Sequence, residues 1–178
     1  MAEEDGLKSA AWFALAVIPR KEKVTARTLR AKGYEEFLPL YKEKRKWSDR
    51  VQTVEMPLFT GYVFSRFDPE NRLPILKIPS VHQIVGFGKS PQPIDDAEIS
   101  ALQTICQAAV QAVPCPYLTA GAKVTLQHGP LKGVEGILVE AKETRLVLSV
   151  SLLQRSVSVE VDREWIAPLR IYGELGGR

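Results

Sequence analysis

Hydrophobic residues recur with a helical period in the first part of the chain and with a strand period in the second. Residues 95–113 show the clearest helical spacing, because apolar side chains return at three- and four-residue steps and would share one helix face. These side chains are Ile99, Leu102, Cys106, Ala109 and Val113. Asp95 with Glu98 forms a capping-box-like start. Pro114 and Pro116 then break the pattern, so we expect the helix to stop before a short linker.

The part before this helix predicts a mixed domain of strands and helices. The apolar run WFALAVI at 12–18 predicts a buried strand, and a helix is expected over residues 21–33. The side chains expected on one face of that helix are Val24, Thr28 and Ala31. Apolar segments flank the charged stretch 42–50, which predicts two strands joined by a polar hairpin. A short helix or turn and a strand at 82–87 follow.

Beyond the prolines, apolar residues alternate with other residues at every second position, which predicts short strands. The alternating residues are Val124 and Leu126; Ile137 and Val139; Leu146, Leu148, Val150 and Leu152; and Val157, Val159 and Val161. About 50 residues of such strands predict a small barrel, since an open sheet would leave two unpaired edges. We therefore expect a flexible tail at 1–10, an N-terminal domain at 11–111, a linker at 112–120, a barrel at 121–170 and a tail at 171–178.

Composition limits the kind of protein. The chain has 178 residues, of which 45% are hydrophobic and 25% charged, so it is long enough to bury a core and belongs to the globular class. Lys and Arg number 24 against 21 Asp and Glu, and the net charge of +3 is too small to indicate nucleic-acid binding by itself. The acidic N-terminus lacks the order of a signal peptide, and no apolar run is long enough to span a membrane. We expect a cytoplasmic protein without a membrane partner.

Residues that could hold a metal or perform catalysis are sparse. Cys106 and Cys115 are nine residues apart and His82 and His128 are widely separated, so no zinc-binding spacing can be built from them. The glycine-rich stretch 128–136, HGPLKGVEG, lacks the Gly-Lys-Ser/Thr order of a phosphate loop and predicts a tight turn between strands. We expect no metal, no cofactor and no enzymatic activity.

The segment FTGYVF at 59–64 places three aromatic rings around one glycine. Strand alternation puts Tyr62 and Phe64 on one face and Phe59 with Val63 on the other. The segment therefore predicts an apolar patch with Tyr62 and Phe64 at the surface and Phe59 partly in the core. The alternative that all three rings are core stays open.

The charged stretch 42–50 surrounds one ring with cations. Its basic residues are Lys42, Lys44, Arg45, Lys46 and Arg50, and its ring is Trp47. Such a stretch fits a nucleic-acid contact, with charge for phosphates and a ring for stacking. It fits equally a solvated hairpin whose tryptophan covers the end of a sheet. The sequence leaves both interpretations open.

Two motifs occur in a fixed order along the chain. LFTGYVF at 58–64 matches the signature LFPGYVF, and GAKVTLQHGPLKGVEG at 121–136 matches the KOW motif. With the elements between them, these motifs make residues 11–170 resemble the NusG family of bacterial transcription elongation factors. The resemblance implies an α+β fold, with an N-terminal NGN-type α/β sandwich domain and a C-terminal SH3-like KOW β-barrel. A stable barrel without fold switching is expected, because the valine-rich alternation over 146–161 suits strands and disfavours helix.

The resemblance also implies partners and contact residues. The N-terminal domain is expected to bind the clamp helices of the RNA polymerase largest subunit, and the KOW barrel to recruit Rho or a small-subunit ribosomal protein. The candidate polymerase contacts are Tyr62, Phe64, Phe59 and Phe87. The candidate partner contacts of the barrel are Leu152 and Leu153 in the loop SLLQR. The KOW turn is expected to comprise Gly129, Pro130, Lys132, Gly133 and Gly136. We expect a monomer.

Some positions depart from the housekeeping members of that family. Thr60 replaces the usual proline, and Leu153 stands where those members carry the phenylalanine used for partner contact. The segment GYEEFLPLYKEKRKWSDR at 33–50 looks more like the specialised paralogues of the RfaH-like group, antiterminators that read the non-template DNA strand on selected operons. Val24 and Thr28 occupy the aligned DNA-contacting positions, so a DNA contact would have to come from basic neighbours or the hairpin tip. These candidates are Lys21, Lys23, Arg27, Lys44, Arg45, Lys46 and Trp47.

The sequence thus predicts an RNA polymerase-binding elongation factor that acts in processivity or antitermination, with an operon-specific role implied by the paralogue resemblance. One alternative is a housekeeping NusG that acts in Rho-dependent termination and in coupling transcription to translation. Another is a ribosome-associated RNA-binding protein, because KOW barrels also occur in ribosomal proteins. The mild net charge and the apolar FTGYVF segment argue against this last alternative.

Overall fold

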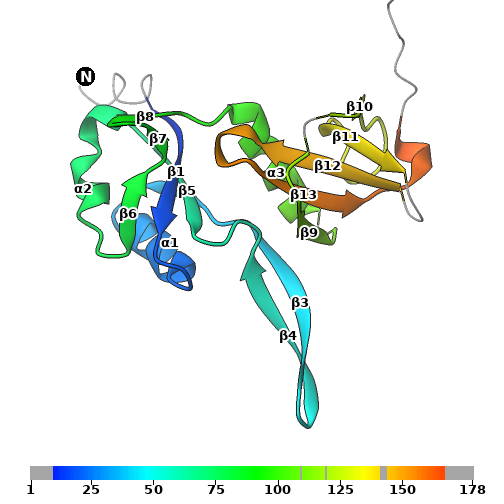
Figure 1. Cartoon of the computed structure of the whole chain (residues 1–178), viewed down its shortest axis with the longest axis horizontal. Helices are drawn as coiled ribbons and strands as arrows, with labels where there is room; N and C mark the ends of the chain where they lie inside the picture. Colours follow the sequence, from blue (N-terminus) through cyan, green and yellow to red (C-terminus); the bar gives the residue numbers. More distant parts are fainter. Residues whose placement is uncertain (1–9, 109, 119, 141–143, 167–178) are drawn as a thin grey trace, which may run out of the picture.

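The computed structural model describes residues 10–108, 110–118, 120–140 and 144–166 (Figure 1). Its N-terminal part is built on a four-stranded antiparallel sheet. In spatial order the strands are β2 (Glu35–Phe37), β5 (Tyr62–Phe67), β1 (Ala11–Val17) and β6 (Val81–Ile84). Strand β1 is central and almost wholly buried, which agrees with the apolar run that predicted it.

Helices cover both faces of this sheet because β1 and β5 are apolar on both sides. Phe13 and Leu15 of β1 pack in one cluster with Leu29 of α1 (Glu22–Ala31) and Ile75 of α2 (Leu73–Leu76). The alternate residues of β1 lie on the other face, where a second cluster includes residues of α3 (Asp96–Gln107). The described members of this cluster from β1, β5 and α3 are Trp12, Ala14, Phe64, Ile99, Leu102 and Ile105.

The buried face of α1 differs from the prediction. The helix buries Glu22, Thr25, Ala26 and Leu29, whereas Val24 is about half exposed. The prediction placed Val24, Thr28 and Ala31 on the buried face, but here a carboxylate and a hydroxyl are buried because both find partners. Thr25 Oγ1 lies 2.6 Å from Ser80 Oγ, and Glu22 accepts a hydrogen bond described below. Gly33 follows the helix end with φ +84°, as the expected stop requires.

A long hairpin projects from the N-terminal part (Figure 1). Strands β3 (Leu40–Trp47) and β4 (Arg50–Pro57) pair along their whole length, from Leu40 opposite Pro57 to Trp47 opposite Arg50. This confirms the two strands and polar hairpin that the charged stretch predicted. A short 3-10 helix, η1 (Pro69–Asn71), precedes α2, and a small hairpin of β7 (Gly86–Phe87) and β8 (Ser90–Pro91) follows β6.

The C-terminal part is a five-stranded antiparallel sheet. Its spatial order is β10 (Ala122–Thr125), β11 (Glu135–Glu140), β12 (Thr144–Val150), β13 (Arg155–Glu160) and β9 (Ala112–Cys115). Two 3-10 helices complete the described residues, η2 (Ser151–Leu153) and η3 (Arg163–Trp165). The period-two pattern correctly predicted β10 to β13, and the mixed helix and strand content confirms the α+β class.

Residues 112–120 do not form the simple linker that the prolines predicted, because Ala112–Cys115 form edge strand β9 against β13. Proline is tolerated on an edge strand, where a missing N–H need not break a ladder. Helix α3 accordingly ends at Gln107, and Val113 belongs to the sheet and not to the helix. Of the tails expected at 1–10 and 171–178, all but Ala10 lie outside the described residues.

Helix α3 also touches the C-terminal sheet. Its N-terminal part is held by Asp95, whose Oδ1 accepts from the Ala97 N–H at 2.9 Å. Glu98 does not close the expected capping box; its Oε1 accepts from the Ser151 hydroxyl at 3.0 Å instead. The cluster that contains Trp12 and Phe64 continues through α3 into Leu148 and Val157 of the sheet. One apolar core therefore connects the two parts of the chain.

Candidate interaction surfaces

The FTGYVF segment folds as a tight turn followed by strand β5. The Tyr62 N–H donates to the Phe59 carbonyl at 3.1 Å, and Gly61 adopts φ +84°, a conformation that favours glycine. Tyr62 and Phe64 lie on the same sheet face, opposite Ala16 and Ala14 of β1, as predicted.

The prediction that Phe64 lies at the surface is wrong for the described structure, because Phe64 is 0% exposed. Phe59, which was expected partly in the core, is 2% exposed and therefore buried as well, so neither ring is an accessible contact. Their rings make an edge contact with centroids 5.7 Å apart, so Phe59 lies on the side of Phe64 and not with Val63. The reason is that Phe59 belongs to the turn, where strand alternation does not apply. Phe37 of the edge strand β2 also stacks with Phe64, with ring centroids 6.1 Å apart.

Tyr62 and Phe87 are the aromatic candidates that retain accessible surface. Tyr62 is half-buried against the core, and Phe87 in the β7–β8 hairpin is 73% exposed. An aromatic ring left in water at the tip of a two-residue strand contributes little to the core of the molecule. The accessible candidates of the predicted patch are therefore the half-buried Tyr62 and the exposed Phe87.

Sequence reasoning missed the residue that supports the aromatic turn. The Glu22 side chain is buried at the start of α1, and its Oε1 accepts from the Gly61 N–H at 2.9 Å. The Gly61 carbonyl accepts from the Val17 N–H at 2.8 Å, so both backbone groups of Gly61 are used. The only local signal was spacing, since Glu22 shares a helix face with Ala26 and Leu29.

Replacing Glu22 tests this support. We expect Glu22→Ala to lower the free energy of unfolding by about 1–3 kcal/mol, because the Gly61 N–H loses its acceptor away from water. Glu22→Gln keeps an oxygen acceptor at the same position and should cost clearly less. Urea unfolding followed by circular dichroism measures both variants, and equal losses for the two would contradict the hydrogen-bond explanation.

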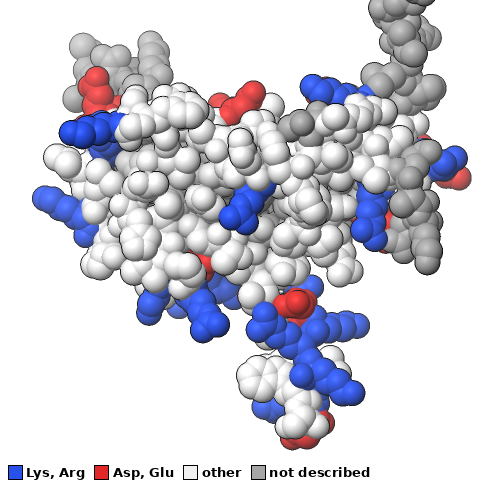
Figure 2. Space-filling model, viewed as in Figure 1, with Lys and Arg blue, Asp and Glu red and all other residues white. Residues whose placement is uncertain are grey.

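The basic candidates lie on the hairpin and on the outer face of α1. The exposed residues of this group are Lys21, Lys23, Arg27, Lys44, Arg45, Lys46 and Trp47. Figure 2 shows the blue side chains gathered along the hairpin and over the adjacent lower edge of the body. The structure thus brings the two sets of predicted residues to one side of the N-terminal part. The Lys23 Nζ and a Glu55 carboxylate oxygen, 3.5 Å apart, join them at the hairpin root.

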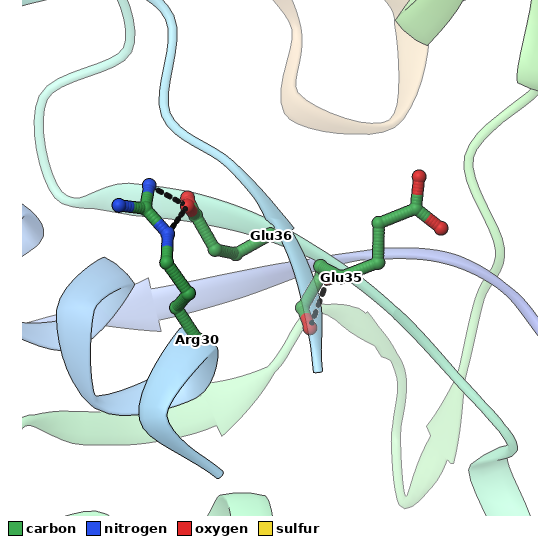
Figure 3. Close-up of polar contacts among 4 residues, drawn as sticks. Arg30, Glu35 and Glu36 are labelled. Carbon is green, nitrogen blue, oxygen red and sulfur yellow. Dashed lines mark hydrogen bonds and ion pairs between the residues drawn. The ribbon is translucent and has the colours of Figure 1, made fainter. Parts of the chain in front are cut away.

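Arg30 at the end of α1 is engaged within the domain. Its Nε and Nη2 donate to the same oxygen of Glu36 on β2, as Figure 3 shows. The neighbouring Glu35 carboxylate points away from Arg30, and its Oε2 lies 3.9 Å from Arg66 Nη1. Arg30 is therefore exposed, but its charge is paired with Glu36.

The KOW turn links β10 to β11. Gly129 and Gly133 adopt φ +79° and +88°, and the Gly133 N–H donates to the Leu126 carbonyl at 2.7 Å. Leu131 between them is fully buried, whereas Pro130 and Lys132 are exposed. The tight turn that the glycines predicted is confirmed.

Leu153, one of the predicted partner contacts, is not exposed in the C-terminal part. It is buried in η2 with 8% of its surface exposed, and Leu152 beside it is half-buried. The preceding residue, Ser151, is held by Glu98 of α3. Of the two predicted partner contacts, Leu152 is the more accessible.

The described residues contain no group of three or more His, Cys, Asp or Glu side chains that could hold a metal ion. Burial raises the pKa of the Cys106 and Cys115 thiols above its ordinary value, which disfavours the thiolate that a metal or a nucleophilic mechanism requires. In the part of the chain that the structure describes, no helix is long and apolar enough to cross a membrane.

The family model described as "Transcription termination factor nusG" matches residues 10–103. The transcription termination/antitermination protein NusG of Helicobacter pylori strain J99 is 25% identical over 116 residues, which cover 63% of this chain and 66% of that protein. The Campylobacter jejuni protein of the same name is 30% identical over 113 residues, which cover 60% of this chain and 63% of that protein.

The matched part spans just under two thirds of these relatives. A solved structure described as "Domain interaction in Thermotoga maritima NusG" has a TM-score of 0.53 at 17% identity and covers 90% of this chain and 98% of that chain, which supports the fold.

The family model covers the whole four-stranded sheet, the hairpin and most of α3, so it defines the class to which the N-terminal domain belongs. The chain is a member of the NusG family. Members of this family are transcription factors and not enzymes.

Proposed function

We propose that this protein is a transcription elongation factor that binds RNA polymerase through its N-terminal domain, on the clamp helices of the largest subunit. The observation that carries the proposal is the match of the NusG family model to residues 10–103, the part that presents Tyr62 and Phe87. The relatives in Helicobacter pylori and Campylobacter jejuni are named transcription termination/antitermination proteins.

The accessible aromatic rings support this surface physically. A ring that is exposed on a rigid hairpin desolvates a large area on binding and loses little conformational entropy, which is why aromatic residues dominate many protein interfaces. Phe87 is held on the short β7–β8 ladder, and the next segment returns along β1, where the Ile94 N–H donates to the Trp12 carbonyl at 2.7 Å. Phe59 and Phe64 would support the surface from within the core.

A pull-down of purified RNA polymerase with the full-length chain tests the proposal. We expect Tyr62→Ser combined with Phe87→Ser to weaken capture by at least roughly tenfold, because aromatic hot spots contribute about 2 kcal/mol or more each. Val24→Ser removes an exposed apolar residue elsewhere and serves as the matched control. Undiminished capture by the folded double variant would show that these rings are not the contact, and failure of the wild-type protein to bind would overturn the proposed function.

We further propose an operon-specific role in antitermination. The support is the exposed basic group on α1 and the hairpin, which offers DNA contacts outside the positions that the specialised paralogues use. The C-terminal sheet would recruit a second partner, Rho or a small-subunit ribosomal protein, with Leu152 as the accessible apolar residue. Transcription through a Rho-dependent terminator with purified components separates the roles, because an antiterminator raises read-through and a housekeeping factor lowers it.

A further inference from the structure

One face of the β3–β4 hairpin carries a row of lysines. Lys42, Lys44 and Lys46 alternate along β3 and therefore point to the same side of the ribbon. Their partners on β4 are Glu55, Thr53 and Val51, respectively, and directly opposed residues share a face. Successive lysines are about 6.8 Å apart along the strand, given the rise per residue of an antiparallel strand.

The acidic residues within the two strands do not cancel this charge, and the remaining acid of the hairpin, Asp49, lies in the turn at its tip. Glu55 is the acid on the lysine face, and its carboxylate lies 3.5 Å from Lys23 Nζ on α1. Glu43 lies on the opposite face, where Arg45 Nε donates to it at 3.0 Å. The lysine face is therefore positive along its length and continues onto the exposed basic residues of α1.

The end of the ribbon combines an exposed ring with a cation. Trp47 is 57% exposed and pairs across the ladder with Arg50, and Val51 beside them is 64% exposed. Lysines alone would suffice to protect an exposed strand edge from pairing with another chain. An exposed tryptophan does not serve that purpose, so the tip has the composition of a contact.

The shape of the ribbon selects the nucleic acid that it fits. Eight residues per strand give a reach of about 26 Å, and two paired strands are about 4.8 Å apart. The major groove of B-form DNA, about 12 Å wide, admits such a two-stranded ribbon, whereas the deep and narrow major groove of A-form RNA does not. A single strand is usually held in a groove with stacking platforms. The ribbon from Arg45 to Gln52 is instead exposed on both faces.

We propose that the β3–β4 hairpin is an arm for duplex DNA, which lies in the major groove with Lys42, Lys44 and Lys46 on the phosphates and with Trp47 and Arg50 leading. This inference deepens the nucleic-acid contact suggested under the proposed function. The inference is tested without polymerase, so a negative result would not count against the proposed binding to polymerase.

The test measures binding of the full-length chain to a fluorescent 20-base-pair DNA duplex by anisotropy over a series of salt concentrations. We expect Lys42→Gln, Lys44→Gln and Lys46→Gln together to weaken binding roughly tenfold at low salt and to reduce the slope of log K against log salt by about 2.7. The matched control removes the same charge from three other exposed lysines. These are Lys77, Lys89 and Lys123. An equal loss of DNA affinity in both triple variants would show that only net charge matters and would overturn the proposal.

The form of the ligand is tested with the same sequence as RNA duplex and as single-stranded DNA. The proposal expects the DNA duplex to bind most tightly and Trp47→Ala to weaken that binding roughly fivefold or more. Single-stranded DNA bound as tightly as the duplex, or RNA duplex bound as tightly as DNA, would overturn the placement in the major groove. Circular dichroism of each variant shows that the ladder is retained, and exposed substitutions of this kind leave the fold intact.

Discussion

Phe64→Ala is expected to lower the free energy of unfolding by about 3–5 kcal/mol, the usual cost of truncating a fully buried phenylalanine. Phe64 has no exposed surface, and its ring packs against the rings of Phe59 and Phe37. Truncation would leave a cavity between the central sheet and the core that α3 completes. Such a loss is a large fraction of the stability of a typical domain.

Urea unfolding followed by circular dichroism measures this loss. Phe87→Ala is the matched control, because it makes the same chemical change at a ring that is 73% exposed, and we expect it to change stability by less than about 0.5 kcal/mol. A Phe64 variant as stable as wild type would mean that the ring is not buried in solution. The result also decides how binding data are interpreted, since a Phe64 variant would lose its partners through unfolding.

Gly129→Ala is expected to destabilise the KOW turn by about 2–5 kcal/mol. The residue adopts φ +79°, which costs a side-chain-bearing residue about 1–2 kcal/mol. A Cβ at this position would also lie 2.5 Å from the Trp165 ring, so the indole would have to move. Overpacking of this kind typically adds 1–3 kcal/mol.

Gly133→Ala separates the two causes. It has a similar φ of +88° in the same turn, but a Cβ there would meet no atom within 4 Å. We expect it to cost only the backbone term, about 1–2 kcal/mol. The difference between the two variants in thermal or urea unfolding then measures the packing of Trp165 on the turn. Equal costs would show that the indole does not pack there.

The FTGYVF segment illustrates what a local pattern could predict. Alternation along β5 correctly placed Tyr62 and Phe64 on one face. It could not show that this face is covered, because the covering residues of α3 lie more than thirty residues further along the chain. The same limit hid Glu22, whose acceptor role depends on Gly61, 39 residues away.

The hairpin and the KOW turn were predictable because their signals are local. Charge between two apolar segments indicated the hairpin, and glycines at close spacing indicated the turn. Strand β9 was not predictable from a local signal, since two prolines in three residues normally indicate an irregular segment. Its partner strand β13 lies some forty residues further along the chain. The basic residues were found by type, but only the strand register sorted Lys42, Lys44 and Lys46 onto one face.

The connection between α3 and β9 is short, which limits how far the two parts of the chain can separate at this point. Helix α3 ends at Gln107 and strand β9 begins at Ala112, so only the four residues 108–111 separate them. Four extended residues span at most about 14 Å. While β9 stays paired, the end of α3 and the start of the C-terminal sheet therefore remain close together. Two partners bound at once, one on each part, are held at a high local concentration of each other, which favours their simultaneous binding.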